Sequence, residues 1–102
     1  MTGEKVAVST FCSVYNIDVQ FINDLENVGL VTIFNYNQES FIDHEQLHEL
    51  EMFTKWKELG INAEGIDALY HAVMRLKTLQ AELNQLREKL KWYEEGETGM
   101  EI

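Results

Sequence analysis

The feature that most constrains this chain is a leucine stripe near its C-terminal end. Apolar residues recur there at alternating steps of three and four: Leu69, Ala72, Leu76, Leu79, Leu83, Leu86, Leu90 and Tyr93. The sequence has no proline, and no glycine falls between Gly65 and Gly96. This spacing is the a/d pattern of a helical heptad repeat. It predicts one long amphipathic helix over residues 62–95, followed by a disordered tail over residues 96–102.

A helix of this length is too long for the rest of the chain to cover. At ~1.5 Å per residue it would span on the order of 50 Å. The whole chain has 102 residues, which is enough for one domain with a modest core. That domain would cover the early stripe, around Leu69 and Ala72, while the distal stripe needs a second chain. We therefore expect a homodimer. Its predicted contact residues are Leu76, Leu79, Leu83, Leu86, Leu90 and Tyr93.

Charged residues beside the stripe favour a parallel pairing of two such helices. With Leu69 at heptad position a, Glu82 is a g residue and Arg87 the following e residue. Lys89 and Glu94 repeat this relation with the signs reversed. Both pairs would attract across a parallel, in-register dimer. Exposed ion pairs contribute only a few tenths of a kcal/mol each, so an antiparallel pairing stays open.

The charge of the chain is acidic and unevenly distributed. The formal net charge is -10, and residues 1–54 hold one basic side chain, Lys5, against nine acidic ones. That half would repel phosphate groups and attract basic partners. Cys12 is the only cysteine, so an internal disulfide is impossible and a reducing cytoplasm is the expected location. Because no apolar run approaches the ~20 residues of a membrane span, no membrane partner is expected.

Two short helices are predicted near the N-terminus. Ser9 is expected to cap the first, which runs to Tyr15, and Asp18 to cap the second, which ends at Gly29. A polar turn over residues 16–18 joins them. Two short helices joined in this way are typical of a helix-turn-helix.

A small β-hairpin and a third helix are predicted next. Residues 30–34 and 39–42 are rich in branched and aromatic side chains, and residues 35–38 supply a polar turn between these two strands. Asp43 is placed to cap the third helix, and Gln46 stands where it would complete a capping box. The hairpin lies where a winged helix carries its wing.

The elements together predict a mainly α fold with three parts. Residues 1–61 form a winged helix-turn-helix domain that includes the third helix. Residues 62–95 form a long helix, capped by Asn62, that packs on this domain and then enters a coiled coil. Residues 96–102 form the tail.

One short motif suggests a metalloenzyme. His44-Glu45-Gln46-Leu47-His48 matches the H-E-x-x-H pattern of zinc proteases, in which two imidazoles share one helical face. Here Asp43 is expected to cap the helix, so His44 would lie in its first turn, and no third ligand is evident. We therefore expect no catalytic residue, no bound metal and no cofactor. A zinc-dependent hydrolase using residues 44–48 remains a remote alternative.

The order of elements resembles the MerR-like winged-helix superfamily. The best local matches are residues 25–31, which read LENVGLV, and residues 59–62, which read LGIN. In MerR-type regulators the second helix carries an Arg-Tyr-Tyr-Glu run, and the wing carries another arginine. At the four positions that correspond to the Arg-Tyr-Tyr-Glu run, this chain has Asn23-Asp24-Leu25-Glu26. The position that corresponds to the wing arginine falls near Ser40. Specific nucleic-acid binding is therefore not expected, because the carboxylates of Asp24 and Glu26 would be repelled by phosphate groups. A DNA-binding transcriptional regulator remains the main alternative.

Within that superfamily the chain looks most like the CbpM-type chaperone modulators. The residues that carry this likeness are Phe11-Cys12, Gly29-Leu30-Val31, Phe41-Ile42-Asp43, Leu59-Gly60-Ile61-Asn62 and Gly65-Ile66. The family often has a tryptophan in the wing, where this chain offers Phe34, Tyr36 and Phe41. The resemblance implies a non-enzymatic protein that binds the J-domain of a DnaJ-like co-chaperone and limits its stimulation of Hsp70.

A J-domain engages Hsp70 through a basic helix, so its inhibitor is expected to present acidic groups. The predicted partner-binding residues are Asp18, Asp24, Glu26, Asp43, Glu45, Glu49 and the wing residue Tyr36. The alternative, that these carboxylates form an ordinary solvated surface, stays open. An exposed wing aromatic would favour an interface.

Overall fold

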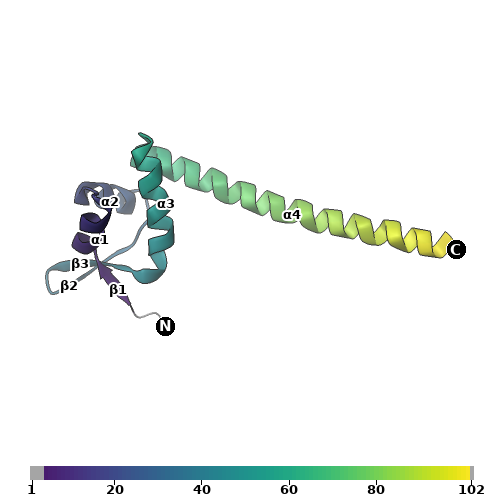
Figure 1. Ribbon diagram of the computed structural model, residues 1–102, viewed down its shortest axis with the longest axis horizontal. Helices are drawn as coiled ribbons and strands as arrows, with labels where there is room; N and C mark the ends of the chain where they lie inside the picture. The colour runs from purple at the N-terminus through teal and green to yellow at the C-terminus, as the bar shows by residue number, and fades with distance from the viewer. Residues whose placement is uncertain (1–3, 102) are drawn as a thin grey trace. The chain divides into compact units, whose positions relative to one another are not determined.

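The order of helices and strands is visible in Figure 1, a computed structural model that describes the backbone of residues 4–101 and the side chains of residues 4–95. The elements are β1 (Lys5–Ala7), α1 (Val8–Tyr15), α2 (Val19–Asn27), β2 (Ile33–Tyr36), β3 (Glu39–Asp43), a 3₁₀ turn (His44–Gln46), α3 (Leu47–Glu58) and α4 (Ala63–Glu101). The chain divides into two units, one reaching Leu69 and the other beginning at Tyr70. This architecture confirms the predicted fold class, which is mainly α with a small sheet and a long C-terminal helix.

The start of α1 differs from the prediction. The residue that precedes the helix is Ala7, with extended backbone angles and no side-chain cap, and Ser9 lies inside the helix. The reason is that β1 runs directly into α1, so sheet pairing sets where the helix begins. Asn16 ends α1 in the left-handed conformation, with φ 56°. The predicted turn over residues 16–18 is confirmed.

The second helix of the helix-turn-helix begins and ends through local signals. Asp18 caps α2, because its Oδ1 accepts a hydrogen bond from the Gln20 N–H at 3.1 Å. Gly29, with φ 85°, turns the chain out of the helix. Left-handed backbone of this kind is favourable for glycine and costly for residues with a Cβ. The predicted cap and stop of this helix are both confirmed.

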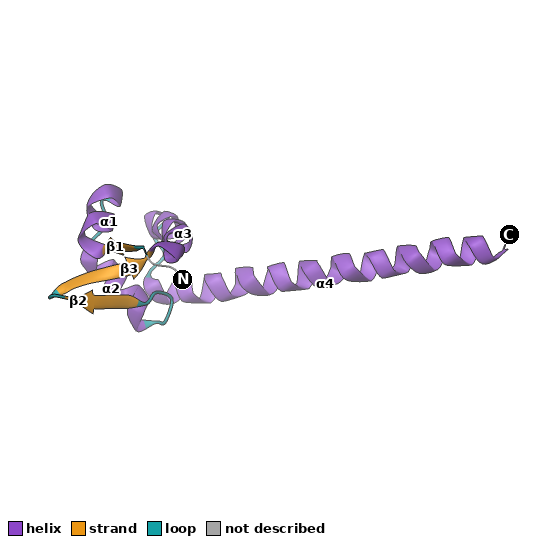
Figure 2. Cartoon of the chain, turned by 90° about the horizontal axis from the view of Figure 1, so that it is seen from below, coloured by secondary structure: helices purple, strands orange, loops and turns teal. Residues whose placement is uncertain are grey.

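The hairpin is part of a three-stranded antiparallel sheet in the order β1-β3-β2, and the sequence did not predict β1. The predicted first strand was also misplaced, since β2 covers Ile33–Tyr36 instead of residues 30–34. The cause is the turn: Asn37 and Gln38 both have positive φ, 53° and 65°, as in a tight two-residue hairpin turn. Residues 35–36 therefore extend the strand. Figure 2 shows the sheet in orange among the helices of the first unit.

The predicted capping box at the start of the third helix is wrong. Asp43 does act as a cap, because its Oδ1 accepts from the Glu45 N–H at 3.2 Å, but the turn that it caps is the 3₁₀ turn. Gln46 bonds elsewhere: its side chain accepts from the Thr32 N–H at 2.9 Å and donates to the Thr32 carbonyl at 3.0 Å. This pair of bonds ties the segment before β2 to the start of α3.

The beginning of α4 follows the prediction and its end does not. Asn62 caps the helix, since its Oδ1 accepts from the Gly65 N–H at 2.8 Å. The helix continues through Gly96 to Glu101, past the predicted end at residue 95, because glycine in a helix costs only about 1 kcal/mol and does not by itself stop it. The predicted tail is therefore helical over residues 96–101. Its side chains and residue 102 lie outside the described residues.

The hydrophobic core of the first unit draws on α1, α2, β3, α3 and the start of α4. Its buried apolar residues are Val8, Phe11, Cys12, Phe21, Ile22, Leu25, Val31, Ile42, Leu50, Phe53, Ala63 and Ile66. The first turn of α4 thus belongs to this core, and Leu69 is half-buried. Ala72 belongs to the second unit and is exposed. Among the described residues, none of the helices is long and apolar enough to cross a membrane.

Candidate protein-interaction surface

The outward side of α2 carries acidic and neutral polar groups. Helix-turn-helix proteins that bind DNA lay this second helix in the major groove. The helix over Val19–Asn27 contains two carboxylates, Asp24 and Glu26, and no basic residue. Glu26 is exposed, while Asp24 is half-buried. A helix with this charge would be repelled by the phosphate backbone.

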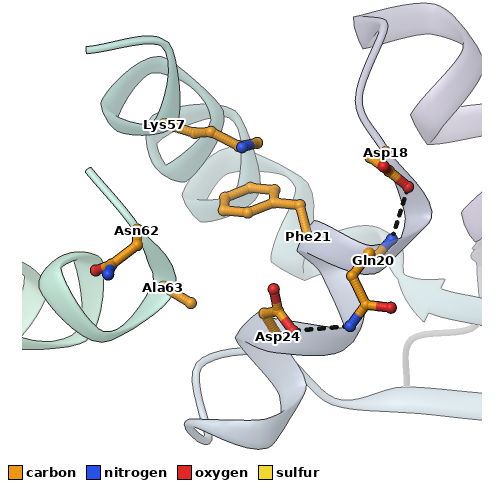
Figure 3. Close-up of a pocket in the computed structure, with 7 residues that line it drawn as sticks. All are labelled: Asp18, Gln20, Phe21, Asp24, Lys57, Asn62 and Ala63. Carbon is orange, nitrogen blue, oxygen red and sulfur yellow. Dashed lines mark hydrogen bonds between the residues drawn. The ribbon is translucent and has the colours of Figure 1, made fainter. Parts of the chain in front are cut away.

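Two of the predicted partner-binding residues line a hollow of about 200 Å³ between α2, the end of α3 and the start of α4. Figure 3 shows Asp18 and Asp24 on either side of Gln20, which bonds to both of them. The Asp24 carboxylate accepts from the Gln20 side-chain amide at 2.9 Å. A carboxylate has about four acceptor positions, so both groups keep capacity for a partner.

A cation also lies at this hollow. The Lys57 Nζ is 5.1 Å from the centre of the Phe21 ring, within the range of a cation–π contact. Lys57, Asp18 and Asp24 all line the same hollow. The lysine therefore offsets part of the negative charge that the sequence suggests at this place. Glu26 does not line the hollow, which makes it the clearest probe of the charge on α2.

The remaining predicted carboxylates lie at the other end of α3. Asp43, Glu45 and Glu49 belong to the end of β3, the 3₁₀ turn and the first turn of α3. Lys57, beside Asp18 and Asp24, is near the last residue of the same helix. Glu49 and Lys57 are eight positions apart in α3, so they are separated by roughly 12 Å along the helix axis at ~1.5 Å per residue. The structure therefore does not bring the predicted acidic residues together into one patch.

The outer side of the sheet forms a third surface, built from aromatic rings. Phe34 pairs with Phe41 across β2 and β3, and two positions further along β3, Asp43 pairs with Lys5 of β1. Alternate residues of a strand share a face, so Lys5, Phe34, Tyr36 and Phe41 lie on the same side. These four residues, here called the wing face, line an apolar hollow of about 320 Å³. Tyr36 is 70% exposed and Phe34 is 41% exposed.

The place of Lys5 on this surface was missed in the sequence. Its strand has three residues, and its pairing partner lies more than thirty positions later in the chain. The short apolar run from Val6 to Val8 was the available signal. Periodicity in so short a segment does not distinguish a strand from a loop.

The distal part of the leucine stripe on α4 is exposed. Its distal members are between 43% and 71% exposed: Leu76, Leu79, Leu83, Leu86, Leu90 and Tyr93. Trp92 is 79% exposed and lies outside the stripe, beside Glu88, Lys91 and Glu95. A continuous apolar stripe of this kind is typical of a helix that pairs with another helix.

The residues of the zinc-protease motif do not lie on one regular helix. His44 is in the 3₁₀ turn and His48 is in α3, so their side chains do not have the i, i+4 relation of an uninterrupted α-helix. Within residues 4–95, no group of three or more His, Cys, Asp or Glu side chains is arranged to hold a metal ion. Burial, with a smaller contribution from the nearby Asp18 charge, raises the pKa of the Cys12 thiol and keeps it in its less reactive protonated form.

Comparison with known proteins agrees with this architecture. Residues 6–88 match the sequence model of the MerR HTH family regulatory proteins, which covers β1 through most of α4. No curated protein and no solved structure matches the chain. Since the family match extends over most of the sequence and the described fold is a winged helix-turn-helix with a long C-terminal helix, the chain belongs to the MerR HTH family of regulatory proteins.

Proposed function

We propose that this protein is a non-enzymatic chaperone modulator, which binds the basic J-domain of a DnaJ-like co-chaperone and limits its stimulation of Hsp70. The family provides a winged helix-turn-helix scaffold. Within that family the chain resembles the CbpM-type modulators, through residues such as Phe11-Cys12 and Phe41-Ile42-Asp43. The interaction would take place in the cytoplasm, as the single cysteine suggests.

The observation that carries the proposal is the chemistry of α2 and the wing face taken together. The helix that would enter a DNA groove bears carboxylates and no cation. The wing exposes the rings of Phe34 and Tyr36. Exposed aromatic side chains anchor protein–protein interfaces, whereas DNA-binding wings need groups that grip phosphate. This combination favours a protein partner over a nucleic acid.

Charge indicates what kind of protein the partner is. Residues 1–54 contain nine acidic side chains and one basic side chain. The helix through which a J-domain engages Hsp70 is basic, so the two surfaces have complementary potentials. Complementary charge speeds encounter and rejects acidic competitors. A modulator bound to that basic helix would block access to Hsp70.

The stripe on α4 supplies a separate surface for self-association. Its exposed leucines and Tyr93 would be covered by the same stripe of a second copy, giving a homodimer. The protein would then have two interaction surfaces, one for a second copy of the chain and one for the co-chaperone.

Calorimetric titration of the full chain with a J-domain tests the proposal. We expect saturable binding that weakens as salt is added. Glu26→Lys should weaken it several-fold, because it reverses a charge on the exposed side of α2. Glu88→Lys is the matched control, since it makes the same change on α4 and should leave the affinity unaltered. Failure of the J-domain to bind the wild-type chain would refute the proposal, and equal effects of the two variants would move the interface away from α2.

Family membership favours a second candidate, a DNA-binding transcriptional regulator. A gel-shift assay at low salt separates the two functions, because low salt strengthens any phosphate contact. The modulator proposal predicts no sequence-specific shift of a duplex. Specific retention of one duplex sequence would instead support the regulator.

A further inference from the structure

The wing face already holds one cation. The Lys5 Nζ lies 4.8 Å from the centre of the Phe34 ring, which is within the range of a cation–π contact. Lys5 is the single basic residue among residues 1–54. The chain's own lysine thus occupies the aromatic surface in the way that a basic side chain of a partner would.

The hollow beside this lysine has room for a further side chain. Its volume is about 320 Å³ and its lining is made by Lys5, Phe34, Tyr36 and Phe41. Most of the exposed ring surface belongs to Tyr36, which is 70% exposed. A flat group can therefore lie against this ring without displacing any buried residue.

Acidic residues stand at the edge of the same face. Glu39 is the cross-strand neighbour of Tyr36, and Asp43 is the cross-strand neighbour of Lys5. Glu39 is exposed, and Asp43 is half-buried. Aromatic rings bordered by carboxylates attract a group that is both flat and positively charged. Arginine fits this description best, because its guanidinium stacks on rings and forms paired hydrogen bonds with carboxylates.

We propose that the wing face is the docking site for an arginine side chain of the protein partner, which stacks on Tyr36 and pairs with Glu39. This inference rests on the proposed function, since it names the group by which a basic protein would be recognised. Lys5 lies on the neighbouring Phe34 ring, so its charge opposes that of an arginine that enters the same hollow. The negative charge of residues 1–54 draws basic segments toward the face.

Two blocked helical peptides of equal length test the proposal with the full-length chain. One contains several arginines, and in the other each arginine is replaced by citrulline, which keeps the shape and removes the charge. Amide chemical shifts of the labelled chain report the site of binding. The arginine peptide should shift the signals of residues 33–43, and the citrulline peptide should not. Shifts confined to α2, or equal shifts with both peptides, would overturn the proposal.

Two variants of Tyr36 then separate the aromatic ring from the strand that carries it. Tyr36→Val keeps a residue suited to a strand but loses the ring, and it should weaken binding of the arginine peptide about fivefold, equivalent to about 1 kcal/mol. Tyr36→Phe keeps the ring and should bind within twofold of the wild type. A Tyr36→Val variant that binds the peptide normally would contradict the proposed stacking.

A lysine pair tests the role of Lys5. Lys5→Met removes the internal cation, and Lys55→Met makes the same change of charge on the exposed side of α3. Lys5→Met should strengthen binding of the arginine peptide more than Lys55→Met, because Lys5 lies within the wing face and repels the arginine at close range. Equal strengthening would mean that net charge alone matters and would overturn the role given to Lys5.

Failure of this inference is distinguishable from failure of the proposed function. If the J-domain binds both the wild type and Tyr36→Val equally, the function stands and the arginine site is wrong. If the arginine peptide binds at the wing while the J-domain does not bind at all, the arginine site stands and the partner is a different basic protein.

Discussion

Asp18 combines a structural role with a proposed recognition role, and the two can be separated. Its carboxylate caps α2 through the Gln20 N–H. Asp18→Asn keeps an oxygen acceptor and removes the charge, so the free energy of unfolding should stay within a few tenths of a kcal/mol of the wild type, while J-domain affinity falls. Asp18→Ala should lose about 1 kcal/mol of stability as well. Urea unfolding at one fixed protein concentration measures the first effect, and calorimetry measures the second. An Asp18→Asn variant as unstable as Asp18→Ala would contradict the cap.

The raised pKa of the Cys12 thiol predicts slow chemical modification. At pH 8 the folded chain should react with iodoacetamide much more slowly than the same chain in urea, because the thiol is buried and protonated. Since the folded-state pKa lies above the unfolded one, this group contributes stability at neutral pH, and that contribution is lost as the pH rises through the raised value. Labelling of the folded chain at the unfolded rate would show that Cys12 is accessible and would contradict its place in the core.

At the scale of single residues, the sequence correctly predicted the features that depend on near neighbours in the chain. Asp18 and Asn62 are caps whose bonds reach N–H groups two or three positions away. Gln46 was misread because its real partner, Thr32, lies fourteen positions earlier, where no local rule points. Ser9 was misread because a strand that pairs with β3 sets the start of α1. Each error comes from a contact between residues distant in the chain.

The wing shows the same limit at the scale of elements. Both strands of the hairpin were expected, and the second was placed within one residue. The first was misplaced because Asn37 and Gln38 adopt left-handed backbone angles. These angles are uncommon for residues other than glycine, so the residue types did not predict them. The aromatic face follows from this corrected register, which pairs Phe34 with Phe41. Tyr36 was expected to take part in binding, but Lys5 could be placed on the same face only through β1.

The stripe on α4 gives a prediction about self-association. Leu83→Glu should weaken the proposed homodimer by on the order of 3 kcal/mol, about a hundredfold, because it places a charge at the centre of the paired stripes. Gln85→Glu adds the same charge two positions away, outside the stripe, and should leave the dimer intact. Sedimentation equilibrium measures both. A wild-type chain that remains monomeric at high concentration would contradict the self-contact itself.

Cross-linking tests the direction of the two helices. In a Cys12→Ser background, Tyr93→Cys places one thiol at a d position of the stripe. A parallel, in-register pair brings this position beside its own counterpart, so mild oxidation should give a covalent dimer. In an antiparallel pair centred near Glu82 the two thiols would lie far apart. A dimer by sedimentation that fails to cross-link would therefore support the antiparallel arrangement.

For the molecule as a whole, we propose that self-association and recognition of a foreign partner belong to different parts of the chain. The leucine stripe belongs to α4, whereas α2 and the wing face belong to the first unit. Variants should therefore sort into two classes. Leu83→Glu should remove dimerisation and leave an intact surface for the J-domain, and Glu26→Lys should do the reverse. A variant of the stripe that abolishes J-domain affinity per chain would show that the two functions are not separable.

We propose that the MerR-type winged helix of this chain recognises a basic protein in place of DNA. Amide chemical-shift titration of the labelled full-length chain with an unlabelled J-domain tests it most directly, because it reports binding and location together. We predict shifts on α2 and on residues 33–43, which include the wing, and these shifts should diminish as salt is raised. The absence of shifts with the J-domain, together with shifts on α2 when a DNA duplex is added instead, would contradict the claim.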